Sequence, residues 1–333
     1  NSRLRKEKAP LAELKPILNT YLENLSKKAY SCELNDLRQK IQCRCREMAG
    51  NASGIYSLTV PTGGGKTLSS LVWAINHAIK HGKKRIILAI PYTSIVTQTA
   101  EILSNIFGRE NVLEHHSNND ELLIKDETLR MKMRLATENW DYPIIVTTNV
   151  QLFESIMSNK PSACRKLHNI CNSVLILDEV QTLPLGHFQP IIDSLQAYQQ
   201  IFGVSVLFTT ASLPALRGDI CWGRGAGRRL RGIENISEII PEEWNLNDKL
   251  RRTRIILDHS PIEEPTLANK LTEHDKVLCI VNTRREAKGV FELLPKEGLN
   301  IHLSRMMCSA HLKKKINELK ECLKDETQKT VRV

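Results

Sequence analysis

The chain of 333 residues is 41% hydrophobic and 25% charged, a composition that is typical of soluble globular proteins and excludes fibrous and disordered ones. No apolar run approaches the roughly 20 residues that a membrane-spanning helix needs, and no hydrophobic signal core follows the charged start. We therefore expect a cytoplasmic protein with no membrane partner. The formal charge of +10 favours an acidic partner such as nucleic acid, although a solvated basic surface would carry the same charge.

The cysteines and the first residue give two further expectations. The nine cysteines show no paired framework, and Cys43 and Cys45 lack the second pair that a zinc site needs, so free thiols are expected. The chain starts at Asn1 without an initiator methionine, which predicts an internal piece of a longer polypeptide.

Residues 1–50 have a helical pattern that is rich in charge and predict a lead-in segment with one apolar face. From Ile55 onward, short apolar runs alternate with helical stretches. The alternation predicts an α/β fold in which a parallel sheet has helices on both faces. The expected strands are 55–60, 86–91, 144–148, 174–179 and 204–212.

A glycine-rich segment lies between the first expected strand and a helix expected at 68–79. It reads Val60-Pro61-Thr62-Gly63-Gly64-Gly65-Lys66-Thr67. Main-chain N–H groups from Thr62 to Thr67 would surround phosphate oxygens at a helix N-terminus, as in a phosphate-binding loop. Lys66 would reach the β- and γ-phosphates of ATP, and Thr67 would hold Mg²⁺. Because Val60 stands where the strict pattern has glycine, a glycine-rich turn is the alternative.

An acidic pair follows the expected buried strand that starts at Val174. Asp178 and Glu179 lie at its carboxyl end, where ligands bind in open α/β sheets. Asp178 would hold Mg²⁺, and Glu179 would polarise water for attack on the γ-phosphate. Such a pair alone would also fit a solvated sheet edge or a helix cap.

The other segments carry weaker signals. His115 and His116 have no metal-ligand partners at suitable spacing, so we interpret them as surface residues in a polar loop. Residues 217–232 are dense in glycine and arginine and predict a long basic loop, either solvated or in contact with DNA through the arginines of 224–231. A second α/β unit is expected near Lys276, with strands at 277–282 and 300–303 and helices at 284–294 and 310–323.

Several segments together resemble superfamily 2 helicases. Gly63 to Thr67, Asp178-Glu179-Val180-Gln181 and Thr209-Thr210-Ala211-Ser212 are similar to motifs I, II and III of that superfamily, in the same order. The segments 90–95 and 146–154 resemble the nucleic-acid-contacting motifs between them. Within the superfamily, the chain from about residue 31 to 333 most resembles the helicase portion of the CRISPR-associated helicase-nuclease of type I systems.

The resemblance implies roles for individual residues. Lys66, Thr67, Asp178 and Glu179 would form the ATP and Mg²⁺ set, and Gln181 would couple hydrolysis to strand contact. Gln42 would sense adenine, although Gln39 competes and an exposed helix position is an equal alternative. The implied contacts to single-stranded DNA come from both expected domains, with ordinary β-propensity as the alternative for the strand threonines. They are Pro91, Thr93, Thr147, Thr148, Thr210, Ser212, Asn282 and Thr283.

The resemblance also implies a domain order. A helical lead-in at 1–50 would precede a first RecA-like, P-loop NTPase domain at 51–245 and a truncated second RecA-like domain at 246–333. The family's metal-dependent nuclease and its helicase motifs V and VI have no match in this sequence. Because a missing arginine finger costs about 10³- to 10⁵-fold in rate in related enzymes, we expect ATP binding with weak hydrolysis.

The leading hypothesis is therefore an ATP-driven helicase core that moves along single-stranded DNA in CRISPR interference. Its implied partners are single-stranded DNA, an RNA-guided surveillance complex and a nuclease domain of the parent protein. The alternatives are another superfamily 2 helicase acting on RNA or DNA, and an ATP-binding interaction module without turnover.

Overall fold

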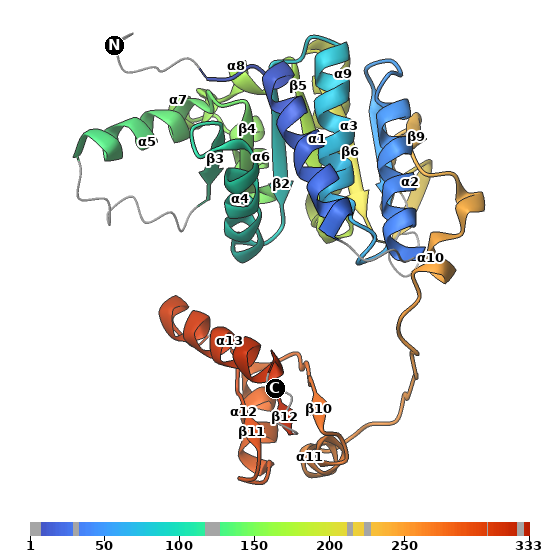
Figure 1. Cartoon of the computed structure of the whole chain (residues 1–333), viewed down its shortest axis with the longest axis vertical. Coiled ribbons are helices and arrows are strands. Elements are labelled where there is room, and N and C mark those ends of the chain that lie inside the picture. The colour runs from blue at the N-terminus through green and yellow to red at the C-terminus, as the bar shows by residue number, and fades with distance from the viewer. Residues whose placement is uncertain are drawn as a thin grey trace. The chain divides into compact units, whose positions relative to one another are not determined.

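The computed structural model describes residues 8–28, 33–116, 127–211, 216–222, 228–304, 306–324 and 330–333. The chain separates into two compact units, Asn1–Arg252 and Thr253–Val333 (Figure 1). The lead-in segment expected at 1–50 lies within the first unit.

The first unit is built on a seven-stranded sheet in which every pairing is parallel. The strand order is β3-β4-β2-β5-β6-β1-β9. The strands are β1 (Ile55–Thr59), β2 (Arg85–Ile90), β3 (Val112–His115), β4 (Ile144–Thr148), β5 (Ser173–Leu177), β6 (Ser205–Thr210) and β9 (Ile236–Glu238).

Helices cover both faces of this sheet (Figure 1). Side chains of β2 alternate between the two cores, because Ile86, Leu88 and Ile90 join one cluster whereas Ile87 and Ala89 join the other. The first core includes α1 (Leu11–Lys28), α2 (Glu33–Met48), α3 (Lys66–Lys80) and α4 (Thr93–Phe107). The second core includes α6 (Asn149–Met157), α8 (Leu167–Ile170) and α9 (Phe188–Ile201).

Shorter elements complete the first unit. They are α5 (Glu127–Asn139), α7 (Pro161–Cys164), α10 (Leu246–Lys249), the 3₁₀ turns η3 (Val180–Thr182), η4 (Leu185–His187) and η5 (Glu242–Trp244), and the antiparallel pair β7 (Asp219–Trp222) and β8 (Arg228–Arg231). The expected long basic loop at 217–232 is therefore wrong where the structure describes it, because β7 and β8 pair there; residues 223–227 lie outside the described part.

Two further expectations for the first unit need correction. His115 and His116 are not surface residues: His115 ends the unexpected strand β3, and His116 is only 7% exposed. The His115 Nδ1 atom accepts a hydrogen bond of 3.0 Å from Trp140 Nε1, and burial lowers the pKa of His115 to about 4. The acidic pair follows β5 instead of belonging to it, because that strand ends at Leu177.

The second unit contains three helices and a three-stranded parallel sheet in its described residues. The central strand β12 (Val331–Arg332) pairs with β10 (Lys276–Val277) and β11 (Leu299–Asn300). The strand expected at 277–282 is thus shorter than predicted, and Leu278 and Ile280 are exposed. The helices are α11 (Glu264–Thr272), α12 (Arg284–Leu293) and α13 (Ser309–Lys324).

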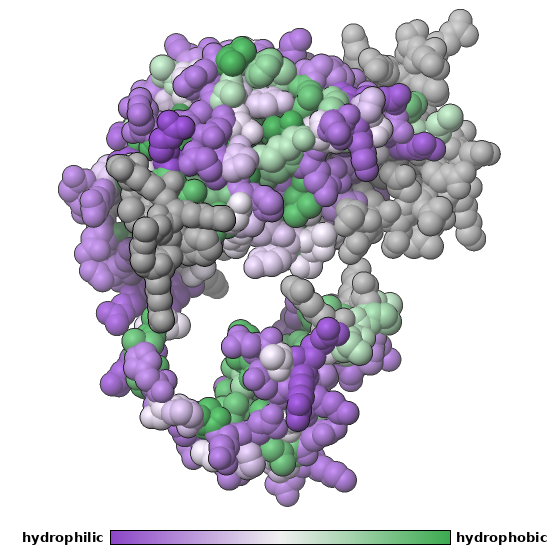
Figure 2. Space-filling view, turned by 180° about the vertical axis from the view of Figure 1, so that it is seen from behind, coloured by the Kyte–Doolittle hydropathy of each residue, from purple (hydrophilic) through white to green (hydrophobic). Residues whose placement is uncertain are grey.

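The segment after Arg252 has an unusual surface. Ile255, Ile256 and Leu257 are each at least 76% exposed, and Figure 2 shows hydrophobic residues on the surface of this narrow connecting segment. No helix in the described residues is both long enough and apolar enough to cross a membrane.

Candidate nucleotide site

The glycine-rich segment forms a tight loop between β1 and α3. Gly63 and Gly65 have φ angles of 85° and 82°, which lie in the left-handed region that glycine adopts without strain. A Cβ atom on Gly64 would lie 2.5 Å from Cγ1 of Val60. All three glycines are therefore required, two for backbone conformation and one for close packing.

The main chain of this loop leaves donors free at the start of α3. The Gly64 N–H donates to the Pro61 carbonyl over 3.1 Å, and the Ser69 N–H donates to the Gly65 carbonyl over 3.0 Å. Within the described part of the chain, no acceptor is found for the N–H groups of Gly65, Lys66 and Thr67. Free N–H groups at the N-terminus of a 15-residue helix form a site for an anion such as phosphate.

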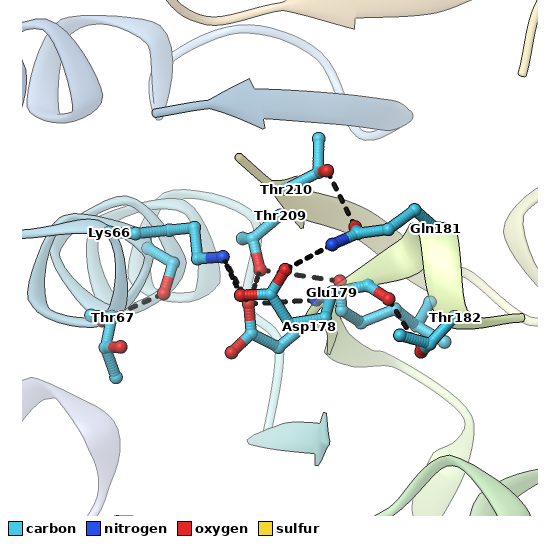
Figure 3. Close-up of polar contacts among 10 residues, drawn as sticks. Lys66, Thr67, Asp178, Glu179, Gln181, Thr182, Thr209 and Thr210 are labelled. Atoms are coloured by element: carbon cyan, nitrogen blue, oxygen red, sulfur yellow. Dashed lines mark hydrogen bonds and ion pairs between the residues drawn. The ribbon is translucent and has the colours of Figure 1, made fainter. Parts of the chain in front are cut away.

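Lys66 lies between the two carboxylates that the sequence singled out (Figure 3). Its Nζ forms an ion pair with Glu179 Oε1 and lies 3.3 Å from Asp178 Oδ1. The side chains of Lys66, Asp178 and Glu179 are 13%, 15% and 27% exposed, so solvent reaches all three. The structure therefore brings together the phosphate-loop lysine and the acidic pair.

Neighbouring strands hold Asp178 in place. Its N–H donates to the Ala89 carbonyl at the end of β2 over 2.8 Å. Leu177 pairs with Phe208 in the β5–β6 register, so the following residues Asp178 and Thr209 also meet. The Thr209 hydroxyl donates to Asp178 Oδ1 (Figure 3). Two strand ends thus fix this carboxylate beside Lys66.

Glu179 occupies a left-handed backbone conformation with a φ of 49°. This turn directs its carboxylate to Lys66, and Gln181 Nε2 donates to the other carboxylate oxygen over 2.6 Å. Burial alone would raise the pKa of Glu179, but the hydrogen bonds from Lys66 and Gln181 and the charge of Lys66 outweigh it. The pKa of Glu179 is therefore below its ordinary value, and the group is ionised at neutral pH.

A chain of contacts leads from Glu179 back to the phosphate loop. Gln181 Oε1 accepts a hydrogen bond of 2.8 Å from the Thr210 hydroxyl (Figure 3). The Thr210 carbonyl accepts one of 3.1 Å from the Val60 N–H. Gln181 therefore connects the acidic pair with the end of β6 and the start of the loop.

The oxygen donors at this edge fit a hard divalent cation. Thr67 is exposed in the first turn of α3, and Asp178 Oδ2 makes no recorded contact with a described residue, so a hydroxyl and a carboxylate oxygen are available. Among the described residues no group of three or more His, Cys, Asp or Glu side chains is arranged to hold a metal ion by itself. Such a sparse set fits Mg²⁺, which keeps several waters and also binds substrate phosphates.

The predicted adenine-sensing residue is not joined to the loop. Gln42 is half-buried in α2, and no hydrogen bond from its side chain to a described residue is recorded; Gln39 is exposed. Arg38, one helical turn before Gln42, instead reaches the loop, as described below.

The residues predicted to contact single-stranded DNA lie in different surroundings. Pro91 and Thr93 are half-buried where β2 leads into α4, and Thr148 lies beside them at the end of β4, where its hydroxyl accepts a hydrogen bond of 3.1 Å from the Gln151 N–H. Thr147 is fully buried and donates to the His115 carbonyl over 2.7 Å. A buried, internally bonded hydroxyl does not reach a nucleic acid, so we do not include Thr147 among the proposed DNA contacts.

The remaining members are distributed over both units. Thr210 is 1% exposed and bonds with Gln181 as described above, and Ser212 lies outside the described residues. Asn282 and Thr283 are exposed in the second unit. Thr283 forms a capping box with Glu286 at the start of α12, which accounts for its hydroxyl as a structural group.

Sequence reasoning missed two residues that position the site. Glu238 at the end of β9 accepts hydrogen bonds from the Thr59 N–H and hydroxyl over 3.0 and 2.9 Å, and so holds the strand before the loop. Thr209 belongs to the segment that resembles motif III, and the resemblance implies no role for it. Its contact with Asp178 follows from the adjacency of two parallel strand ends, a signal that a predicted strand order would have supplied.

A cavity in the first unit lies away from this site. Its volume is about 480 Å³, and it is lined by residues at the amino ends of β2 and β5, including Arg85, Asn169 and Cys171. The candidate nucleotide site is instead an open edge formed by strand ends and a loop.

Comparison with known proteins assigns the family. Residues 39–218 match the model of the DEAD/DEAH box helicase family, which is more than half of the chain. The chain belongs to the DEAD/DEAH box helicase family. The recognition of a superfamily 2 helicase from its motifs is thereby confirmed.

This chain is similar to curated proteins that are named Cas3. The CRISPR-associated nuclease/helicase Cas3 of Haloferax volcanii is 28% identical over 216 residues, which are 56% of this chain and 23% of that protein. A putative CRISPR-associated nuclease/helicase Cas3 of Methanocaldococcus jannaschii is 31% identical over 164 residues, or 45% of this chain and 22% of that protein. The chain thus spans less than a quarter of the length of these relatives.

Solved structures agree on the fold. T. fusca Cas3 matches 98% of this chain and 42% of its own with a TM-score of 0.61 and 16% identity. Its AMPPNP complex matches 88% of this chain and 40% of its own with a TM-score of 0.59 and 17% identity. At this identity the likeness shows the fold, and the expected RecA-like α/β fold with a parallel sheet is confirmed.

Proposed function

We propose that the first unit binds ATP with Mg²⁺ and hydrolyses it, as the motor of a helicase that moves along single-stranded DNA. The observation that carries the proposal is the meeting of Lys66, Asp178 and Glu179 beside the free N–H groups of the phosphate loop. Phosphoryl transfer requires main-chain N–H donors for the phosphates, a lysine ammonium group that can move to the phosphates, and a carboxylate that acts as a base.

The proposed chemistry starts with an exchange of partners at Lys66. Without nucleotide, its ammonium group is held by two carboxylates. With nucleotide bound, Lys66 would turn from them to the β- and γ-phosphate oxygens, and Thr67 and Asp178 would hold Mg²⁺, which would neutralise phosphate charge. Glu179 would then be released from its ion pair and would accept a hydrogen bond from the attacking water.

Gln181 is proposed to link hydrolysis with strand movement. Its amide contacts Glu179 on one side and Thr210 on the other, so a change at the carboxylate moves the end of β6. Pro91 and Thr93, where β2 leads into α4, are proposed single-stranded DNA contacts of the first unit, together with Ser212. Asn282 is the proposed contact of the second unit. The positive net charge supports a nucleic-acid partner.

The CRISPR role rests on the relatives, whose names describe them as CRISPR-associated nuclease/helicases. We propose that this chain is the helicase part of such a protein, in which residues from 253 onward belong to a second RecA-like domain. A nuclease domain of the parent and an RNA-guided surveillance complex are its proposed partners.

A comparison of nucleic-acid cofactors tests the proposal. ATP hydrolysis by the parent protein is expected to rise with single-stranded DNA and to respond less to a single-stranded RNA of the same sequence. Stimulation by RNA alone would favour another helicase of the family. ATP binding without hydrolysis under any of these conditions would favour a non-hydrolysing interaction module.

A further inference from the structure

Arg38 of helix α2 contacts the phosphate loop. Arg38 donates two hydrogen bonds to the Gly63 carbonyl, from Nε over 3.0 Å and from Nη2 over 2.7 Å. Its third donor, Nη1, bonds to the Asn35 side-chain oxygen one turn earlier over 3.2 Å. The planar guanidinium is thus bound to two acceptors, and two of its nitrogen atoms donate to the same loop oxygen.

The acceptor belongs to the peptide group that determines the shape of the loop. In the Gly63–Gly64 peptide, the carbonyl accepts from Arg38 and the N–H donates to the Pro61 carbonyl. The Gly64 Cα packs against Val60 and Leu250, as the short distances to a Cβ built on it show. Glycines rotate easily, so a peptide tied at both ends keeps the following N–H groups of the loop aligned for phosphate.

The helix that carries Arg38 is itself fixed. Ile41 and Cys45 are fully buried against the first core, and Arg44 Nε donates to the Ile239 carbonyl beyond β9 over 3.2 Å. Arg38 therefore projects from a rigid support, which is what a residue that pre-organises a binding site requires.

A second arginine at the loop provides a comparison. The Arg252 guanidinium lies so close to Gly63 that its Nη2 would be 2.9 Å from a Cβ built there. No hydrogen bond from the Arg252 side chain to another described residue is recorded. The two arginines thus place similar charge beside the same glycine, but of these two only Arg38 has recorded hydrogen bonds to the loop backbone.

We propose that Arg38 is a positioning residue for nucleotide binding, which holds the phosphate loop in its anion-binding shape through the Gly63 carbonyl. This inference rests on the proposed binding of ATP by the same loop. It assigns to the lead-in helix a role in the site that does not depend on contact with adenine.

Isothermal titration of the 333-residue chain with AMPPNP and Mg²⁺ tests the inference, with Arg38→Ala, Arg38→Lys and Arg252→Ala compared with the unchanged chain. Because the two hydrogen bonds come from a charged donor, both Arg38 variants are expected to bind about tenfold more weakly. Arg252→Ala is expected to bind within about twofold. Arg38→Lys keeps the charge and most of the stem, so it remains informative even where the alanine variant folds poorly.

A thermal unfolding measurement without nucleotide accompanies each titration. A small change in Tm together with the tenfold loss of affinity supports positioning, because a purely structural residue would change Tm and leave the affinity of the folded chain intact. Unchanged affinity in Arg38→Lys, or an equal loss in Arg252→Ala, would overturn the inference and show that charge alone matters. Failure of the unchanged chain to bind AMPPNP would instead overturn the proposed function, and this inference with it.

Discussion

The two edges of the seven-stranded sheet treat polar groups in opposite ways. At the carboxyl edge, Lys66, Asp178 and Glu179 are partly exposed and share their contacts. At the amino edge, His77 is fully buried, with Nδ1 3.0 Å from the Ala49 carbonyl and Nε2 2.9 Å from the Ser205 hydroxyl. The polar groups at the carboxyl edge therefore have partners that a ligand can replace. The polar groups at the amino edge instead stabilise the fold.

Titration behaviour follows the same division. The pKa of Glu179 is lowered against the effect of burial by neighbours that stabilise its charge, so it stays ionised. Burial lowers the pKa of His77 to about 4, so this ring is neutral at pH 7. Changes at the carboxyl edge are therefore expected to affect activity, and changes at the amino edge to affect stability.

Glu179→Gln is expected to give the largest effect. The amide cannot accept a proton from water, so hydrolysis is expected to fall by about 10²- to 10⁴-fold. ATP affinity is expected to stay equal or to rise a few-fold, because Lys66 loses one competing carboxylate. Single-turnover hydrolysis with protein in excess over ATP, together with titration of ATP, measures both. Hydrolysis that persists at the original rate would remove Glu179 from the proposed base role.

His77→Phe is expected to affect stability and not nucleotide binding. The change leaves the Ser205 hydroxyl and the Ala49 carbonyl without their ring partner and should cost about 1–3 kcal/mol. Denaturant unfolding followed by tryptophan fluorescence measures this cost in the first unit, which contains all four tryptophans. An AMPPNP affinity that fell along with stability would contradict the separation of the two edges.

Acid is expected to lower the free energy of unfolding of the unchanged chain through His77. Between pH 6.5 and about 4 the unfolded state binds a proton that folded His77 does not bind, so stability falls as pH falls through this window, by up to about 3 kcal/mol. His115, whose pKa is also about 4, acts in the same direction. Unfolding at pH 7.5 and 5 should therefore show a smaller pH dependence in His77→Phe. An identical dependence would mean that other groups cause the acid sensitivity.

Gln181→Ala is expected to give the smallest effect. It removes contacts to Glu179 and Thr210 but no phosphate ligand, so ATP affinity should remain within about twofold while DNA-stimulated hydrolysis falls several-fold. Steady-state hydrolysis by the parent protein with and without single-stranded DNA measures the change. Equal loss of basal and stimulated rates would indicate a role in the chemical step instead of coupling.

The central strands could be predicted from the sequence because they are continuous apolar runs that are buried on both faces. β3 and β9 were not predicted, because Val112–His115 carries charged and ring side chains and Ile236–Glu238 is only three residues long. The unexpected burial of His115 depends on Trp140, a contact between segments that no local pattern reveals.

The site shows the same limit. Lys66, Asp178 and Glu179 could be predicted to meet, because their motifs place them at the carboxyl ends of strands in one sheet. Arg38 could not, since its partner is a main-chain carbonyl that any residue provides. Thr147 matched a motif but is buried, because β4 is buried along its whole length on both faces of the sheet.

Titration of the 333-residue chain with AMPPNP and Mg²⁺ tests the central claim most directly, with Lys66→Ala at the carboxyl edge compared with Lys84→Ala beside the amino end of β2. The account predicts that Lys66→Ala loses at least about a hundredfold in affinity, as expected for a desolvated lysine–phosphate contact. Lys84→Ala should bind like the unchanged chain. Equal binding by both variants would contradict the assignment of the nucleotide site to this edge.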